Sequence, residues 1–341
     1  MFKTKLSTIL ALVAVLSLLL VPAAYADTGG TTTGSFGARS QPPTVSAIGI
    51  FTDITCLNPA LSMDPLTEYY VKVTVGSVNK LSNLDTVEVT LFYDSAGNDP
   101  VAPTTPNTQT CAILTWNASG TTWTINPTGG GTTWVLGTCT APANPELTTG
   151  DWIFAFTPGK VATESTGTAN WDAQGLVTNK SAQTGEMYDR DTAMNWYGEI
   201  TITPPLLVDW GPVDLGLLFA GAANPETDIK INYIANGNYA ENIKSTNWTG
   251  AVSAETVALD ESGGNPPTDP GEFALMGNDI NALGSAVIVN KTSYTDTDIT
   301  GTLTTEGGDD VNTNTLWLSL SASGITPDTY SGSIYYQITN R

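Results

Sequence analysis

The chain has 341 residues and carries 33 acidic against 12 basic side chains, which gives a formal net charge of −21, and it contains no histidine. Because phosphate binding needs basic patches, this surplus of acid excludes nucleic acid as an expected partner. The lack of histidine excludes Ser-His-Asp triads, histidine-ligated metals and imidazole acid–base catalysis.

Residues 1–26 have the pattern of a secretory signal peptide. Lys3 and Lys5 precede an apolar run over residues 9–21, and Ala24-Tyr25-Ala26 supplies the small residues of a cleavage site. An uncleaved membrane anchor is the alternative. We expect cleavage before Asp27 and an extracellular or cell-surface protein whose mature chain has no membrane span.

Residues 27–43 are rich in Gly, Thr, Ser and Pro, which predicts a flexible, disordered leader. Such a segment could complete a neighbouring subunit as a donor strand, but that role needs alternating apolar residues. With Phe36 as its single large apolar side chain, the leader is a poor candidate for it.

The first half of the mature chain then shows short runs with the alternation of half-buried strands, separated by Gly, Pro, Asn and Asp clusters. These runs cover residues 45–51, 69–75, 86–93, 111–116, 121–125, 132–136, 152–156, 172–177 and 197–203. The last of them ends at Pro204-Pro205. Because two prolines remove consecutive backbone donors, a stiff joint between two β modules is expected there.

The second half repeats the pattern without repeating the sequence. Its expected strands cover residues 227–234, 255–259, 272–276, 286–289, 298–303, 316–320 and 330–338. We therefore predict an all-β protein with two antiparallel Ig-like β-sandwich domains in tandem, at residues 44–204 and 205–341, after the signal peptide at 1–26 and the leader at 27–43. No helix is expected in the mature chain.

Short motifs in both halves resemble Ig-like β-sandwich modules of archaeal or bacterial surface-layer, pilus and coat-type extracellular proteins. The second half contributes Val208-Asp209-Trp210-Gly211-Pro212-Val213-Asp214-Leu215-Gly216, Asn236-Gly237-Asn238 and Pro327-Asp328-Thr329-Tyr330-Ser331-Gly332-Ser333-Ile334. The first half contributes Gly159-Lys160-Val161-Ala162-Thr163 and Asn195-Trp196-Tyr197-Gly198-Glu199-Ile200. The resemblance implies architecture and location, and it carries over no catalytic residue.

These observations favour an exported structural or adhesive cell-surface protein, a subunit of a surface layer or extracellular filament. Its expected partners are further copies of itself or other envelope proteins. The closing strand at 330–338 contains no charge and no proline, so it lies either inside a sheet or at an edge used for assembly.

A carbohydrate-binding module is the alternative function, with surface glycans as partners. Six of the nine tryptophans fall between residues 116 and 196, and an exposed set of Trp116, Trp123 and Trp134 would suit a sugar platform. Tryptophans that share a strand face with aliphatic residues are more often part of a core.

A glycoside hydrolase is the third candidate. Glu186 with Asp189 or Asp191 could supply its two carboxylates, although nothing in the sequence singles out such a pair. A solvated acidic surface explains these residues equally well, so we predict no enzyme activity.

No cofactor is expected apart from calcium, which takes six to eight oxygen ligands. Three groups of acidic and amide residues could provide them, although turns use the same residue types without a metal. The groups are Asp94, Asn98 and Asp99; Asp189 and Asp191; and Asp309, Asp310, Asn312 and Asn314.

The sequence offers candidates for two covalent modifications, a disulfide and N-glycosylation. Cys111 and Cys139 bracket an expected three-strand meander, which favours a disulfide between them and leaves Cys56 over, although three cysteines allow three pairings. Glycosylation sequons begin at Asn117, Asn179, Asn247 and Asn290. A chain rich in Asn, Ser and Thr also produces such triplets by chance.

Overall fold

The computed structural model describes Ser35 and residues 39–128, 133–202, 208–222, 226–278 and 281–341. The signal peptide, most of the leader and the Pro204-Pro205 joint therefore lie outside the described residues. Strands account for 48% of the chain and helices for 3%, which confirms the all-β, antiparallel class. Within the described ranges, no helix is long and apolar enough to cross a bilayer.

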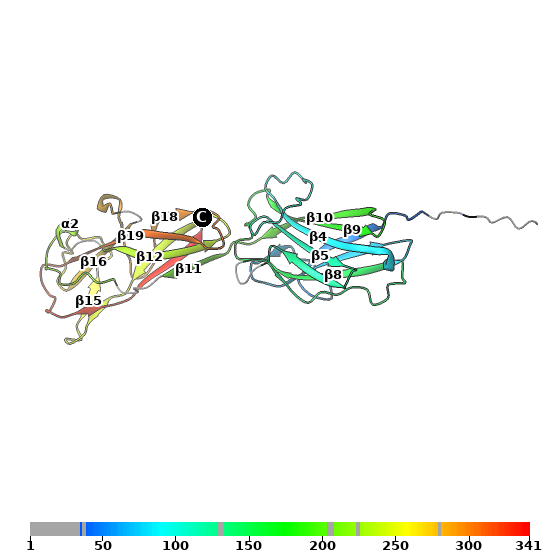
Figure 1. Cartoon of the computed structure of the whole chain (residues 1–341). Helices are drawn as coiled ribbons and strands as arrows, with labels where there is room; N and C mark the ends of the chain where they lie inside the picture. The colour runs from blue at the N-terminus through cyan, green and yellow to red at the C-terminus, as the bar shows by residue number, and fades with distance from the viewer. Residues whose placement is uncertain (1–34, 36–38, 129–132, 203–207, 223–225, 279–280) are drawn as a thin grey trace, which may run out of the picture. The chain divides into compact units, whose positions relative to one another are not determined.

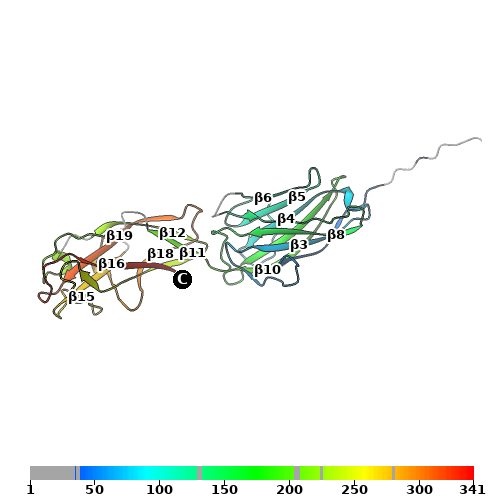
Figure 2. The same ribbon diagram turned by 90° about the horizontal axis from the view of Figure 1, so that it is seen from below.

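The first sandwich consists of a four-stranded and a six-stranded sheet (Figures 1 and 2). The four-stranded sheet has the order β1 (Thr44–Phe51), β3 (Tyr69–Gly76), β8 (Thr149–Thr157), β7 (Val135–Leu136). The six-stranded sheet has the order β2 (Ser62–Met63), β10 (Thr184–Met194), β9 (Asn170–Asn179), β4 (Leu84–Asp94), β5 (Cys111–Asn117), β6 (Thr122–Asn126). The strand pairs are antiparallel except β2 with β10.

Alternation of side chains builds the core between these two sheets. In β3, the four residues Tyr69, Val71, Val73 and Val75 are buried while the residues between them are half-buried. They pack in one cluster with the buried valines and leucines of β4 and with tryptophans of β5, β8 and β9. Successive side chains of a strand point to opposite faces, so a single register places the whole apolar set inside.

The second sandwich pairs a large sheet with a small one. The large sheet has the order β11 (Gly198–Ile202), β12 (Glu226–Ala235), β19 (Asp309–Leu320), β16 (Glu272–Asn278), β15 (Thr256–Leu259), β14 (Trp248–Gly250), β20 (Tyr330–Ser331), and β17 (Val287–Ile288) also pairs with β16. The small sheet has the order β18 (Thr295–Gly301), β13 (Tyr239–Ser245), β21 (Ile334–Asn340). Three strands are too few to cover the inner face of the larger sheet.

The second core lies between these sheets and includes Tyr233, Ile243, Phe273, Leu318 and Ile338. The outer face of the large sheet carries a smaller cluster, in which Phe219 of the single-turn helix α2 (Phe219–Ala222) packs on Ala274 and Trp317. The sequence did not predict this helical turn, because four residues are too short to show a helical period.

The strand at 198–202 corrects one expectation. We expected it to complete the first half, but β11 pairs with β12 from Gly198 opposite Ala235 to Ile202 opposite Ile231. Alternation reveals a half-buried strand and not its partner, which is why the sequence assigned it to the wrong sheet. Residues 41–341 form one compact unit, and a division into domains at 204/205 stays a prediction.

Candidate functional site

Three carboxylates of the first sandwich, those of Asp94, Asp99 and Asp172, each offer an oxygen within 4.8 Å of the others. Arg190 of β10 lies against them, with Nη1 2.5 Å from Asp172 Oδ2 and Nε 3.8 Å from Asp99 Oδ1. Burial raises the pKa of Asp172, whereas the hydrogen bond from Arg190 lowers it. The arginine thus supplies in this cluster the positive charge that a metal ion would bring.

The other acids near this cluster have separate partners. The backbone N–H of Ile50 donates to Asp189 Oδ2 at 3.2 Å, and Gln174 Nε2 donates to Glu186 Oε2 at 2.7 Å. Asp191 is exposed with a φ of 67°, and Asn98 is exposed in the turn after β4. Among the described residues, Asp189 and Asp191 belong to no group of three metal-ligating side chains.

The run from Asp309 to Asn314 lies within strand β19, whose pairing with β12 shifts register between Val311 and Asn314. An extended strand sends successive side chains to opposite faces, whereas a calcium site gathers its ligands around the ion, and calcium binding here stays a prediction. Asn314 is buried and donates to Tyr233 Oη at 3.4 Å, while Asp309 is exposed. The side chains of Asp310 and Asn312 lie outside the described residues.

All three cysteines have free thiols, so the expected Cys111–Cys139 disulfide is not formed in this structure. Cys111 begins β5 in the six-stranded sheet, while the Cys139 thiol contacts the carbonyl oxygens of Gly137 and Ala155 beside the four-stranded sheet. The two positions thus lie at different sheets of the sandwich. Burial raises the pKa of Cys111 to about 11.

The tryptophans proposed as a sugar platform lie in the first core. Trp116 and Trp134 are buried, and Trp123 packs partly buried against the same cluster. The Trp123 ring meets those of Trp116 and Phe154 at centroid distances of 6.4 and 5.0 Å. Their roles are therefore packing, as expected for tryptophans that share strand faces with aliphatic residues.

The sequon asparagines differ in how accessible their amides are. Asn179 is buried, and its Nδ2 donates to Gln41 O and Gln183 Oε1, both at 3.1 Å. Asn117, Asn247 and Asn290 are partly exposed. Glycosylation stays a prediction, and it fits these three positions better than Asn179.

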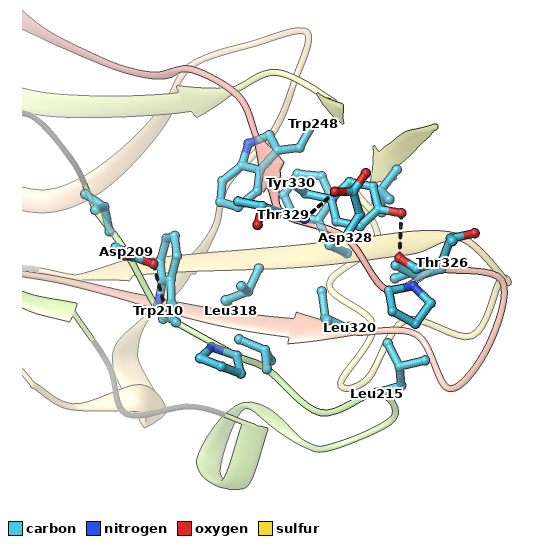
Figure 3. A pocket seen from close by; sticks show the side chains of 18 residues that line it. Asp209, Trp210, Leu215, Trp248, Leu318, Leu320, Thr326, Asp328, Thr329 and Tyr330 are labelled. Atoms are coloured by element: carbon cyan, nitrogen blue, oxygen red, sulfur yellow. Dashed lines mark hydrogen bonds between the residues drawn. The ribbon is translucent and has the colours of Figure 1, made fainter. Parts of the chain in front are cut away.

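A cavity of about 590 Å³ lies in the second sandwich. Its walls are mostly apolar side chains from two loop stretches, residues 208–215 and 325–330, and from the strand residues Trp248, Val257, Phe273, Leu318 and Leu320. Figure 3 shows Trp210, Trp248, Leu318, Leu320 and Leu215 among the side chains around it. Nothing in the sequence marked this cavity, because its walls are distant in the chain.

Two aspartates, Asp209 and Asp328, line the cavity among these apolar side chains. Asp328 accepts hydrogen bonds from the backbone N–H groups of Val252 and Ser253 and from Ser253 Oγ, at 2.7 to 2.9 Å. These bonds, those from Ser253 above all, lower its pKa to about 2. Asp328 is therefore charged at neutral pH.

A fully buried acid, Glu241 of β13, lies within the second core. Tyr233 Oη donates to its Oε2, and Thr297 Oγ1 donates to its Oε1 at 2.9 Å. Burial raises the pKa of Glu241 to about 7, and these hydrogen bonds oppose the shift. Sequence reasoning missed this residue, because one Glu in a polar stretch carries no sign of burial.

The last strand, β21, is an edge strand. Among the described residues it pairs only with β13, from Ser245 opposite Ile334 to Tyr239 opposite Asn340. It contains no charged residue and no proline, and Tyr335, Gln337 and Asn340 are exposed. Figure 2 shows it as the red strand that ends at the label C.

Several other edge strands of the described chain are protected from pairing, although β6 (Thr122–Asn126) is, like β21, an edge strand without charge, proline or register shift. β18 has a register shift and carries Asp296 and Asp298, the latter at a φ of 62°. β1 has a register shift, and one of its N–H groups, that of Ile50, donates to Asp189. The strands β2, β7 and β20 have two residues each. Charges, bulges and short length are the devices by which natural proteins prevent edge pairing. β21, with seven residues, has none of them, and five-residue β6 has neither charge nor bulge.

No known family model and no curated protein matches the chain. Solved structures that are similar include the major pilin subunit of Bacillus cereus, with a TM-score of 0.26, 9% identity and coverage of 80% of this chain and 64% of that one. A 35 kDa C-terminal fragment of the major pilin of Streptococcus agalactiae gives a TM-score of 0.24 and 11% identity over 86% and 91% of the two chains.

A third similar structure is a complex of a chaperone and a tip adhesin of CFA/I fimbriae, with a TM-score of 0.25 and 10% identity over 89% and 92% of the two chains. The chain spans less than two thirds of the Bacillus cereus chain. At these TM-scores the likenesses carry no argument about function, which has to come from the chain's own residues.

Proposed function

We propose that the protein is an exported structural subunit of the cell surface, which assembles with further copies of itself into a layer or filament through the edge strand β21. The observation that carries this proposal is the exposed, uncharged edge of β21. An edge strand presents unpaired N–H and C=O groups, which a strand of a second copy can satisfy by extending the three-stranded sheet.

The described residues give less support to the other two candidate functions. The tryptophans of the carbohydrate-binding hypothesis pack in the first core. The acids of the glycosidase hypothesis are engaged separately, Asp189 by Ile50 and Glu186 by Gln174. The signal-peptide pattern at residues 1–26 supports export, and the net charge of −21 supports a soluble, self-repelling surface that needs a specific contact to assemble.

The test places a lysine on the edge of the small sheet. Gln337→Lys adds charge to an exposed position of β21, and lysine on an edge strand disfavours pairing with another strand. Thr300→Lys is the matched control, because it places a lysine at an exposed position of β18, the opposite edge of the same sheet.

Sedimentation of the mature protein should show concentration-dependent assembly for the wild type and for Thr300→Lys, and monomers for Gln337→Lys. Circular dichroism should show the same fold in all three. A wild-type protein that stays monomeric at high concentration would refute the proposal, and so would a Gln337→Lys variant that assembles like the wild type.

A further inference from the structure

The cavity of the second sandwich has the size and the walls of a small-molecule site. Its volume of about 590 Å³ falls in the range typical of ligand pockets, roughly 300 to 1,000 Å³. The aromatic rings of Trp210, Trp248 and Phe273 follow one another along it, with centroid distances of 5.7 and 4.8 Å. An occupant must therefore present an apolar body to most of the wall.

Several polar groups of the wall are engaged within the protein, whereas the buried Nε1–H of Trp210 has no hydrogen-bond partner among the described residues. Tyr330 Oη donates a hydrogen bond toward Glu255 Oε2 at 2.7 Å and lies 2.9 Å from Thr326 O. Asp209 Oδ1 accepts from Gly211 N at 2.8 Å, and Asp328 accepts three hydrogen bonds from the turn at 252–253. An occupant is thus selected by shape and charge more than by new hydrogen bonds to these groups.

The charge of the wall has one sign. Asp209 and Asp328 are its charged residues, and among the described residues no lysine or arginine lines the cavity. Asp209 is exposed and Asp328 is half-buried, so water screens part of their charge, and the remaining field attracts a cation and repels an anion. The faces of the aromatic rings add to the attraction, because their quadrupoles favour a positive charge placed over them.

We infer that this cavity binds a small organic cation with an apolar body, of the aryl- or alkylammonium class. This activity is separate from the proposed assembly through β21, since none of the cavity residues belongs to that strand.

The experiment uses the full mature chain and three small aromatic probes with different charges: benzyltrimethylammonium, benzyl alcohol and phenylacetate. Isothermal titration should give the cation a dissociation constant about tenfold lower than that of the neutral alcohol, with the anion weakest, given the usual strength of cation–π and charge attraction. Equal binding of the cation and the alcohol, or no binding of the cation, would overturn the inference.

Two substitutions locate the binding within the cavity. Leu320→Trp should weaken binding of all three probes by placing an indole ring in part of the space. Asp209→Asn should weaken binding of the cation several-fold and leave the alcohol unchanged. Asp85→Asn, at an exposed position of β4, is the control for the change in net charge. If Asp85→Asn weakens the cation as much as Asp209→Asn does, or if Leu320→Trp binds the probes as tightly as the wild type does, the site is elsewhere and the inference fails.

Discussion

The cores of the two sandwiches are packed to different degrees. In the first, sheets of four and six strands enclose a core that holds Trp134, Trp152 and Trp171 almost without exposure. In the second, a sheet of three strands faces a much larger one, a cavity remains, and Glu241 is buried in the core. The first sandwich has a core filled by aromatic rings, whereas the second contains a cavity that can bind a ligand and a buried glutamate that can titrate.

The largest difference should appear on truncating an aromatic residue in each core. Trp171→Ala removes a fully buried ring that packs on Tyr93 and Trp134, and it should cost about 3–5 kcal/mol in the free energy of unfolding. Trp210→Ala removes a half-buried ring that already borders a cavity, and it should cost about 1–2 kcal/mol. Denaturant titration measures both, and equal losses would contradict the contrast between the cores.

The second effect is a pH dependence that belongs to the second sandwich. The groups around Glu241 are Tyr233, Thr297 and Asn314, which hydrogen-bond within the cluster, and Asp296, Tyr239 and Tyr336, which lie near it. The pKa values of the three tyrosines are raised by burial, so these residues stay neutral up to pH 9. Asp296 acts in the same direction as burial, raising the pKa of Glu241.

Because the folded-state pKa of Glu241, about 7, lies above the ordinary value of 4.5 for a glutamate, its protonated form favours the folded state. The stabilisation is fully present below pH 4.5 and is lost as the pH rises through 7, with a total on the order of 3 kcal/mol. Glu241→Gln should remove this part of the pH profile of the denaturation midpoint between pH 4 and 9. Identical profiles for the two proteins would show that Glu241 does not titrate in this range.

A smaller effect is expected at the acidic cluster of the first sandwich. Arg190→Gln leaves the half-buried cluster of Asp94, Asp99 and Asp172 without its cation and should cost about 1–3 kcal/mol. Lys80→Gln, which breaks the exposed pair with Glu146, should cost less than about 1 kcal/mol. Calcium should raise the melting temperature of the Arg190→Gln variant more than that of the wild type. An equal rise in both would show that the arginine does not compete with the metal.

The smallest effect concerns the thiols. The raised pKa of Cys111 and its burial predict slow alkylation at pH 8, slower than at Cys139, which is only half-buried. Mass spectrometry under non-reducing conditions should find three free thiols. A mass lower by two hydrogens, with Cys111 and Cys139 in one cross-linked peptide, would restore the disulfide that the sequence favoured.

Strands with clean alternation could be predicted from the sequence, and strands with buried or paired charges could not. The run at 69–75 became β3 because its valines fall on one face. In contrast, no strand was predicted at β10, which carries Asp189 and Arg190, and their partners Ile50 and Asp172 lie on other strands. Charge in a strand is compatible with burial only when a partner is present, and partners distant in the chain leave no local signal.

The sites show the same limit. The sequence predicted a closing strand without charge or proline, but only the order of the small sheet places β21 at an edge. The cavity depends on the meeting of stretches that are far apart in the chain, which neither a period nor a motif encodes. The carbohydrate-binding hypothesis started from the number of tryptophans in the first half, and that number says nothing about which of them are exposed.

Hydrogen exchange of the backbone amides of β21, compared between dilute and assembled protein, tests the central claim most directly. An edge strand exposes part of its N–H groups to water, and a partner strand from a second copy would protect them. The account predicts that amides between Ile334 and Asn340 become protected on assembly while those of the first sandwich do not change. Assembly without any gain of protection in β21 would contradict it.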